Sequence, residues 1–245
     1  MLLLERELPR VPTASLEIDR VHSVFGKLPR NVFVVSDSAP IIARELGIPL
    51  ETVVEILQTP NPVLYPDVPS FLQRISVVGS LPSVWTQGHI DAGVDIEVLA
   101  AQSELAFQSI KLVRSGLHMH LLPFGEKLSQ MGIPGIFGGF DKCDPNVVLP
   151  VLRSVQMHGL ERVVAVDDLA ANLTQLGEIC TMVNMPFTPV LIDRRENSQT
   201  GAITSFNELT VVNNSLYLID LDRTQIGTDA MKQDLYTRLA QNLPR

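Results

Sequence analysis

Four groups of polar residues in this chain could together carry out phosphoryl transfer. Each group closely follows a short apolar run: Asp37 follows 32–35, Thr86 follows 83–85, Lys142 follows 136–140, and Asp167 with Asp168 follows 163–166. A carboxylate can attack phosphorus, and a set of carboxylates can hold Mg²⁺. A hydroxyl and an ammonium group can stabilise the charge on the oxygens of a phosphoryl group during transfer.

The apolar runs predict the strands that position these residues. Short runs rich in Val and Ile, bounded by polar residues, are typical of strands buried on both faces of a sheet. We predict strands at 32–36, 83–86, 136–140, 163–167 and 190–192, and helices between them at 40–46, 50–57, 96–114, 146–158 and 170–182. This alternation predicts an α/β fold, with a Rossmann-like parallel sheet and helices on both faces. Ligands bind at the carboxyl ends of such strands, which is where the four polar groups stand.

The segments that flank this pattern predict the domain organisation. We expect an N-terminal extension at 1–30, an α/β core at 31–209 and a C-terminal extension at 210–245. Four prolines in 60–70 exclude a regular helix or a central strand, so this stretch is predicted to be a connector into a helix at 71–75. In the C-terminal extension, 210–220 is predicted to be a hairpin that turns at Asn213 and Asn214, and 229–243 to be an amphipathic helix.

The order and context of the polar groups resemble the haloacid dehalogenase superfamily from about residue 32 to residue 209. The resemblance rests on four features: a Pro-Asp-Val-Pro run at 66–69 entering a helix, a strand that ends in Thr86-Gln87-Gly88, Lys142 before a helix start at Asp144-Pro145, and Asp167-Asp168 with Asn172 after them. Most members of this superfamily are Mg²⁺-dependent phosphatases that pass through an aspartyl-phosphate. Each motif is weak by itself, and their combination in this order is more specific.

The resemblance implies a role for each matching residue. Asp37 would be the nucleophile, and the phosphoryl group would be held by Thr86, Gln87, Gly88 and Lys142. The cofactor would be Mg²⁺, and its ligands would be Asp37, the backbone carbonyl of Ala39, Asp167 and Asp168. The substrate would be a phosphorylated compound.

The first motif departs from the family pattern, which is an apolar strand followed by Asp-x-Asp-Gly-Thr. With Asp37 as the nucleophile, Ala39, Pro40 and Ile41 replace the second Asp, the Gly and the Thr. This frame lacks the general acid, which typically contributes a factor of about 10² to 10⁴ in rate. In the other frame Asp37 is the second Asp, and Val35 at the nucleophile position excludes covalent chemistry. We favour the first frame because it sets Asp37 directly after the predicted strand.

Three functions stay open at this point. The first is a phosphohydrolase with the roles given above, and the second is a catalytically inactive binding or regulatory protein with the same fold. The third is cleavage of carbon–halogen or carbon–phosphorus bonds, since family members with those activities also lack the second Asp. Those members carry a substantial cap domain. Here the spacing leaves room only for a minimal helical cap at 40–59, so we rank the third function lowest.

A minimal cap would leave the site open, which favours a macromolecular phosphosubstrate or a partner subunit that acts as a lid. Each site residue also has a structural alternative, because Asp37 and Asp167-Asp168 could cap helices, Thr86 could be a turn hydroxyl and Lys142 a solvated loop charge. His118 and His120, at strand spacing without a third ligand nearby, are interpreted as partly buried or edge histidines rather than metal ligands. Other candidates for substrate contact at the rim are His89, Arg194 and Arg195.

Composition excludes several other classes of protein. The 245 residues include 19 Lys and Arg against 27 Asp and Glu, a formal net charge of −8, and no basic cluster suits nucleic acid or a membrane surface. No apolar run approaches the length of about 18 residues that spans a bilayer, and the first ten residues do not resemble a signal peptide. Cys143 and Cys180 lack metal-site spacing and are expected to be reduced thiols, which favours a cytoplasmic location. Whether the chain forms homo-oligomers stays open.

Overall fold

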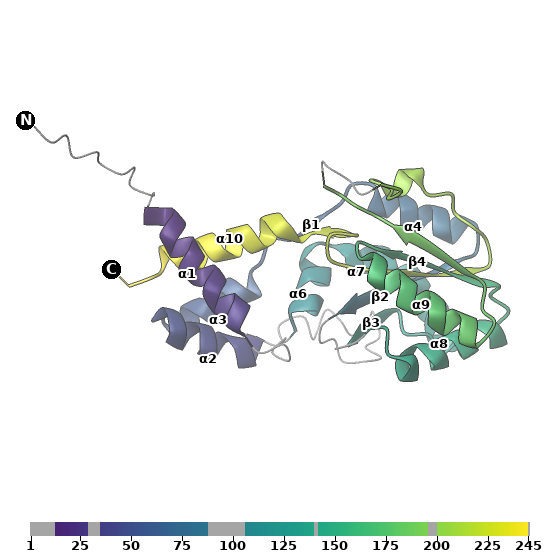
Figure 1. The fold of residues 1–245 in the computed structure, drawn as a ribbon, viewed down its shortest axis with the longest axis horizontal. Coiled ribbons are helices and arrows are strands. Elements are labelled where there is room, and N and C mark those ends of the chain that lie inside the picture. The colour runs from purple at the N-terminus through teal and green to yellow at the C-terminus, as the bar shows by residue number, and fades with distance from the viewer. Residues whose placement is uncertain (1–12, 29–34, 88–105, 140–141, 196–199, 245) are drawn as a thin grey trace, which may run out of the picture.

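A computed structural model describes residues 13–28, 35–87, 106–139, 142–195 and 200–244. These residues form an α/β unit and a smaller helical unit that lie side by side (Figure 1). Within the described residues, none of the helices has the length and the apolar character needed to cross a membrane.

The α/β unit is built on a five-stranded parallel sheet with the order β3-β2-β6-β4-β5. The strands are β2 (Leu81–Gln87), β3 (Ile136–Gly139), β4 (Arg162–Asp167), β5 (Phe187–Leu191) and β6 (Ser215–Ile219). The predicted parallel α/β architecture is confirmed, as are the strands predicted at 83–86 and 163–167. The strand predicted at 136–140 is confirmed up to Gly139, and Phe140 lies outside the described residues. The run at 190–192 belongs to the end of β5, which begins earlier than predicted.

The central strand of the sheet is β6, and here the sequence-based prediction of a hairpin at 210–220 is wrong. All five residues of β6 are buried, and the strand pairs in parallel with β2 on one side and β4 on the other. Asn213 and Asn214 belong to the segment that leads into β6, and Asn214 has a φ of 48°. A strand buried on both faces needs a continuous apolar run, which Leu216–Ile219 supplies.

The strand predicted at 32–36 is also wrong in its described part. Val35 and Ser36 begin helix α2 (Val35–Leu46), while 32–34 lie outside the described residues. Val35, Ala39, Ile42 and Leu46 recur at helical spacing and are buried together on one face of this helix. Val35, the described apolar residue of the predicted strand, is therefore buried by helical packing.

Two pairs of helices cover the sheet. Helices α4 (Val68–Val77) and α7 (Leu117–Gln130) contact each other and β2, whereas α8 (Pro145–Met157) contacts α9 (Ala170–Met182), which packs on β4 and β5. The connection from β2 to β3 runs toward one edge of the sheet, and the connections from β3 to β4 and from β4 to β5 run toward the other. Because right-handed crossovers in opposite directions lie on opposite faces, the two pairs of helices cover opposite faces of the sheet (Figure 1). Of the helix predicted at 96–114, the described part is α6 (Phe107–Arg114). His118 and His120 lie in α7, so their interpretation as strand residues is wrong.

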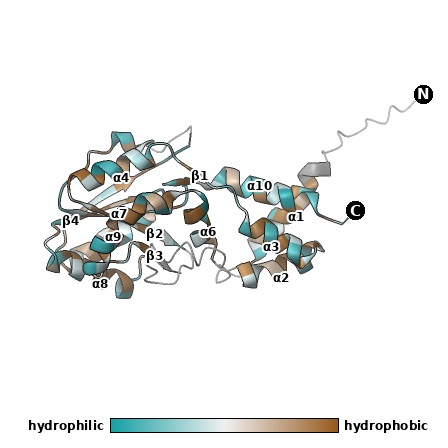
Figure 2. Ribbon diagram, turned by 180° about the vertical axis from the view of Figure 1, so that it is seen from behind, coloured by the Kyte–Doolittle hydropathy of each residue, from teal (hydrophilic) through white to brown (hydrophobic). Residues whose placement is uncertain are grey.

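The helical unit is formed by both ends of the described chain. Helices α1 (Thr13–Lys27), α2, α3 (Leu50–Gln58) and α10 (Thr228–Gln241) bury one shared apolar core, and α1 packs against α10. Figure 2 shows that α1, α3 and α10 carry both hydrophobic and hydrophilic residues, as amphipathic helices do. The expected minimal cap at 40–59 was too small, because helices from both sequence extensions pack with α2 and α3.

A short antiparallel pair, β1 (Val63–Leu64) with β7 (Ile226–Gly227), lies where the chain passes between the two units. β1 follows α3 of the helical unit, and β7 leads directly into α10. A 3-10 helix, η1 (Phe206–Glu208), completes the described elements and packs against α4.

Candidate active site at the carboxyl end of the sheet

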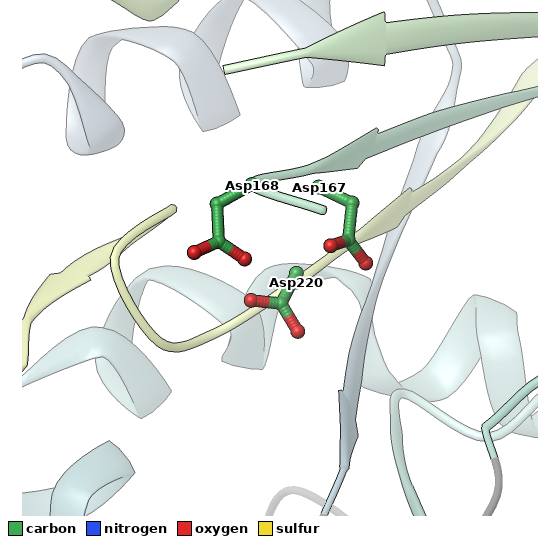
Figure 3. Close-up of side chains that lie close together, drawn as sticks. All are labelled: Asp167, Asp168 and Asp220. Atoms are coloured by element: carbon green, nitrogen blue, oxygen red, sulfur yellow. The ribbon is translucent and has the colours of Figure 1, made fainter. Parts of the chain in front are cut away.

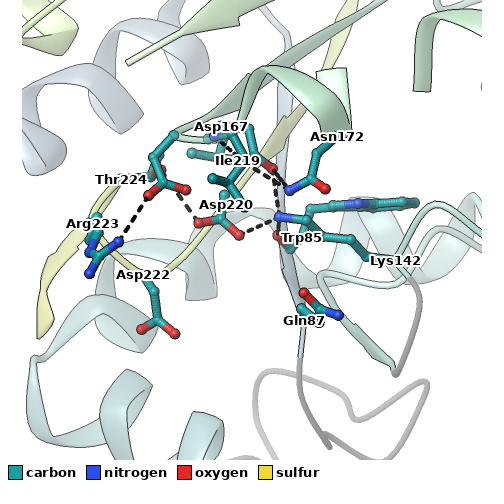
Figure 4. A network of polar contacts seen from close by, with 12 residues as sticks. Trp85, Gln87, Lys142, Asp167, Asn172, Ile219, Asp220, Asp222, Arg223 and Thr224 are labelled. Carbon is teal, nitrogen blue, oxygen red and sulfur yellow. Dashed lines mark hydrogen bonds and ion pairs between the residues drawn. The ribbon is translucent and has the colours of Figure 1, made fainter. Parts of the chain in front are cut away.

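Four neighbouring strands bring polar side chains to one edge of the sheet. Thr86 lies near the end of β2, Lys142 follows β3, Asp167 ends β4 and Asp220 directly follows β6. All four strands run in parallel, so their carboxyl ends share this edge. Figure 4 shows the side chains that converge there.

Lys142 is the centre of this cluster. Its Nζ lies 2.5 Å from Asp167 Oδ2 and 2.5 Å from Asp220 Oδ1, and it donates to the Trp85 carbonyl at 3.5 Å (Figure 4). Burial alone would lower the pKa of Lys142, but the carboxylates of Asp220 and Asp167 outweigh burial and hold the pKa above its ordinary value. The lysine is therefore a buried cation fixed between two carboxylates.

Asp220 has the most perturbed carboxyl group of the site. Burial, the largest influence, and the neighbouring Asp167 raise the pKa of Asp220 to about 7, although Lys142 acts in the opposite direction. Its backbone N–H donates to the Val166 carbonyl at 2.8 Å, which fixes the end of β6 against β4. The Thr224 hydroxyl donates to Asp220 Oδ2 at 3.4 Å. A rigidly held carboxyl group whose charge is disfavoured is typical of functional sites.

Three carboxyl groups at this edge could hold a metal ion. Oxygens of Asp167, Asp168 and Asp220 lie within 4.8 Å of one another (Figure 3). Asp167 is oriented by the Leu169 N–H at 2.8 Å and by the Asn172 amide at 3.1 Å. Burial and the nearby Asp167 raise the pKa of Asp168, so a cation placed among these groups would relieve their mutual repulsion. Hard oxygen donors of this kind suit Mg²⁺.

The loop after β6 is a tight turn held by its own polar groups. Gln225 donates its side-chain amide to the carbonyls of Ile219 and Asp220, and the N–H groups of Gln225 and Ile226 both donate to the Leu221 carbonyl at 3.0 Å. Arg223 has a φ of 60°, a left-handed conformation that costs a residue with a side chain roughly 1 kcal/mol or more. The turn brings Asp220, Asp222 and Thr224 into one loop.

Asp222 forms an ion pair with Lys111 of α6. Lys111 Nζ lies 2.6 Å and 2.7 Å from the two carboxylate oxygens of Asp222, and Gln108 donates to the same group at 3.4 Å. Burial would raise the pKa of Asp222, but the ammonium group of Lys111 outweighs it and keeps the pKa below its ordinary value. This carboxyl group is therefore ionised in the free protein.

The structure brings together some of the site residues that the sequence predicts and not others. Thr86, Lys142, Asp167 and Asp168 meet at the edge of the sheet, and Gln87 lies beside them at the end of β2. Gly88 and the rim candidate His89 lie outside the described residues. The rim candidates Arg194 and Arg195 instead form ion pairs with Asp67 and Asp193 at 2.7 Å.

The placement of Asp37 and Ala39 corrects the predicted nucleophile and metal ligand. Asp37 is exposed in the first turn of α2, where it accepts a hydrogen bond from Ser36, and Ala39 is fully buried in the core of the helical unit. Helix α2 and strand β4 lie in different units, well apart in both Figure 1 and Figure 2. Asp37 and Ala39 are therefore not among the residues that meet Asp167 and Asp168 at the edge of the sheet.

The sequence interpretation missed Asp220, Asp222, Thr224 and Lys111. The first three follow the apolar run 216–219 in the spacing Asp-x-Asp-x-Thr, which is the signal that could have found them. Lys111 had no comparable signal, because its partnership with Asp222 joins residues 111 positions apart.

A cleft of about 810 Å³ lies over the cluster, between the two units. Its lining includes Lys142, Asp168, Asp220 and Asp222 from the α/β unit, and Leu57 and other side chains from the helical unit. A volume of this size is in the range of small-molecule sites. The candidate site therefore lies in a cleft to which both units contribute lining side chains.

Comparisons of the chain with models of protein families, with curated proteins and with solved structures find no match.

Proposed function

We propose that this chain is a Mg²⁺-dependent phosphohydrolase that works through an aspartyl-phosphate on Asp220, as its resemblance to the haloacid dehalogenase superfamily implies. The observation that carries the proposal is the position of Asp220 at the end of the central strand. Lys142 Nζ lies 2.5 Å from its carboxylate, and Asp167 and Asp168 approach it closely enough to share one cation. Thr86 ends the neighbouring strand on the other side.

The residues after β6 support this assignment better than the residues after 32–35 do. The sequence from Asp220 to Thr224 matches the family pattern Asp-x-Asp-Gly-Thr except that Arg223 stands where Gly is usual. Arg223 has the positive φ that a glycine would adopt without strain. In the resembled family this motif comes first along the chain, whereas here it comes last. We therefore infer a circularly permuted order of the same motifs.

The residues of the site have distinct roles in this mechanism. The Asp220 carboxylate attacks phosphorus, the bond from phosphorus to the leaving oxygen breaks, and Asp222 donates a proton to that oxygen. A water then attacks the phosphorus of the aspartyl-phosphate, Asp222 takes up the water's proton, and inorganic phosphate leaves with Asp220 restored. Because Lys111 keeps Asp222 ionised in the free protein, their ion pair must separate as the substrate binds, and Asp222 must take up one proton from solvent before it can donate that proton to the leaving oxygen. Thr86 and Lys142 hold the phosphoryl oxygens.

The three carboxyl groups fit Mg²⁺ by their chemistry. They are oxygen donors and lie within 4.8 Å of one another. Burial, together with the neighbouring Asp167 carboxylate, raises the pKa values of Asp168 and Asp220, so a cation among them would favour their charged forms. Asp167, Asp168 and Asp220 would hold the ion. A bound Mg²⁺ would neutralise charge on the transferring phosphoryl group.

Two earlier alternatives lose their support under this assignment. An inactive protein was considered because Asp37 is followed by a degenerate motif, and that ground does not apply to Asp220. A macromolecular substrate was considered because the site was expected to be open. A cleft of about 810 Å³ that is lined by side chains of both units favours a small phosphorylated molecule instead.

Turnover of an activated aryl phosphate with Mg²⁺ tests the proposal. Asp220→Asn should lower kcat by at least about 10³-fold, because an amide is a poor nucleophile toward phosphorus. Asp37→Asn is the matched control, since Asp37 is exposed on α2, and it should leave kcat unchanged within about twofold. Asp222→Asn should slow alkyl phosphates by about 10² or more and aryl phosphates much less, because only a poor leaving group needs the acid.

Three outcomes would contradict the proposal. Activity retained in Asp220→Asn would exclude Asp220 as the nucleophile. Activity lost in Asp37→Asn would show that Asp37 on α2 is needed for catalysis. Absence of turnover, together with no rise in melting temperature at millimolar Mg²⁺, would exclude a working site.

A further inference from the structure

The cleft over the candidate site has two walls of different chemistry. The α/β unit supplies the charged wall, with Lys142 and the carboxyl groups around it. The opposite wall is largely apolar, and its side chains are Phe25, Leu57, Phe107, Met231, Leu235 and Tyr236. A ligand that fills the cleft must therefore place its phosphoryl group on one wall and an apolar body against the other.

The apolar wall excludes several substrates. A sugar or polyol would bury hydroxyl groups there, and each buried hydroxyl without a partner costs roughly 1–3 kcal/mol. An aromatic or aliphatic ring instead gains from leaving water. The cleft volume of about 810 Å³ holds a ring-sized group but not a folded protein or a nucleic acid.

Helix α10 adds polar groups to the apolar wall. Thr228, Met231, Lys232 and Leu235 recur at helical spacing and line the cleft, so they share one face of α10. The Lys232 ammonium has no ion-pair partner within the part of the chain that the structure describes, and it lies close enough to Asp222 to act on that carboxylate. The buried Thr228 hydroxyl likewise has no hydrogen-bond partner among the described residues. Lys232 is exposed, so its ammonium group can pair with an anionic group of a ligand in the cleft.

We propose that the substrate is a phosphomonoester whose leaving group is an apolar ring bearing a second anionic group, such as a carboxylate, that pairs with Lys232. The inference rests on the proposed function, because the phosphoryl group must lie at Asp220. It adds the chemistry of the leaving group: the ring packs on Met231 and its neighbours, and the anion pairs with Lys232 on α10.

Three phosphate esters test the leaving group by turnover with Mg²⁺. The wild-type protein should prefer 3-carboxyphenyl phosphate over phenyl phosphate, and phenyl phosphate over glycerol phosphate, in kcat/KM. In Lys232→Gln the preference for the carboxylated ester over phenyl phosphate should fall about fivefold, as expected for one exposed ion pair. In Met231→Gln the preference for phenyl phosphate over glycerol phosphate should fall about threefold or more. Lys127→Gln, an exposed lysine on α7, is the matched control and should change neither ratio.

Binding to the Asp220→Asn protein separates this inference from the proposed function. Calorimetry with 3-carboxyphenyl phosphate and phenyl phosphate needs no turnover, so the same preference and its loss in the Asp220→Asn, Lys232→Gln double variant would support the leaving-group assignment even if catalysis fails. Equal affinity for the two esters, or a preference that Lys232→Gln leaves unchanged, would overturn the assignment. Turnover without any such preference would overturn it while leaving the phosphohydrolase proposal intact.

Discussion

Replacing Asp220 by Asn should stabilise the metal-free protein, and the gain should grow with pH. Asp220 is buried beside Asp167, and burial is the largest of the influences that raise the pKa of this carboxyl group from 3.8 to about 7. The unfolded chain releases this proton near pH 3.8, whereas the folded protein retains it until about pH 7. Stability therefore falls as the pH rises between these values, and Asn, which does not ionise, avoids that loss.

The size of the effect follows from the pKa of Asp220. The whole rise corresponds to about 4 kcal/mol, at about 1.4 kcal/mol for each unit of pH. About two of the three units lie above pH 5, so the stabilisation by Asp220→Asn should increase by about 3 kcal/mol between pH 5 and pH 8. Millimolar Mg²⁺ should reduce this increase, because a cation among the carboxylates removes most of the penalty on their charge.

Urea unfolding of both proteins in EDTA, at several pH values from 5 to 8, measures this difference. Asp37→Asn is the control. Because Asp37 is exposed on α2, this substitution should change the free energy of unfolding by no more than about 0.5 kcal/mol at any of these pH values. A difference between wild type and Asp220→Asn that stays flat with pH would refute the reasoning. So would a loss of stability in Asp220→Asn at pH 8 that exceeds the loss at pH 5.

Three other perturbations have definite expected outcomes. Lys142→Met leaves the buried carboxylates of Asp167 and Asp220 without their cation and should lower the free energy of unfolding by about 3 kcal/mol at pH 7. An unchanged midpoint of urea denaturation would contradict the central role of this lysine. Burial would raise the pKa of Asp67, but hydrogen bonds from Arg194 and Ser205 outweigh it and hold the pKa below 3.8. The stability from this carboxylate is present above pH 4 and lost as the pH falls through its folded pKa, so Asp67→Asn should cost about 3 kcal/mol at pH 7 and clearly less at pH 3. Burial raises the pKa of Cys180 to about 12. At pH 8 iodoacetamide should therefore label this thiol at least about 100-fold more slowly in the native protein than in the urea-unfolded protein, as measured by mass spectrometry. Rapid labelling of the native protein would show that the thiol is accessible.

Much of the fold could be predicted from the sequence because buried parallel strands and amphipathic helices have distinct patterns. The strand at β4 and the helix α9 after it were found within one residue of their bounds. The prediction failed at β6, where Asn213 and Asn214 suggested a hairpin turn. Turn residues indicate where a strand begins or ends, but they do not say whether it pairs with its neighbour in sequence or crosses to the centre of a sheet.

The candidate site could be predicted where one strand end carries its own signal and could not where partners come from distant elements. Lys142 and Asp167 were found because each follows an apolar run. Asp37 was chosen because a carboxylate after an apolar run, early in the chain, fitted the expected order of motifs. In the described residues Val35 instead begins helix α2, whose apolar side chains share a core with α1, α3 and α10.

The order of the motifs along the chain matters less to the site than the order of the strands in space. The cluster around Lys142 needs β6 between β2 and β4, and hydrogen bonds along both of its edges fix that position wherever the strand occurs in the sequence. The described chain begins and ends with α1 and α10, which pack against each other in the helical unit, away from β6. The circular permutation that we propose would therefore leave the arrangement of Lys142, Asp167 and Asp220 at the edge of the sheet unchanged.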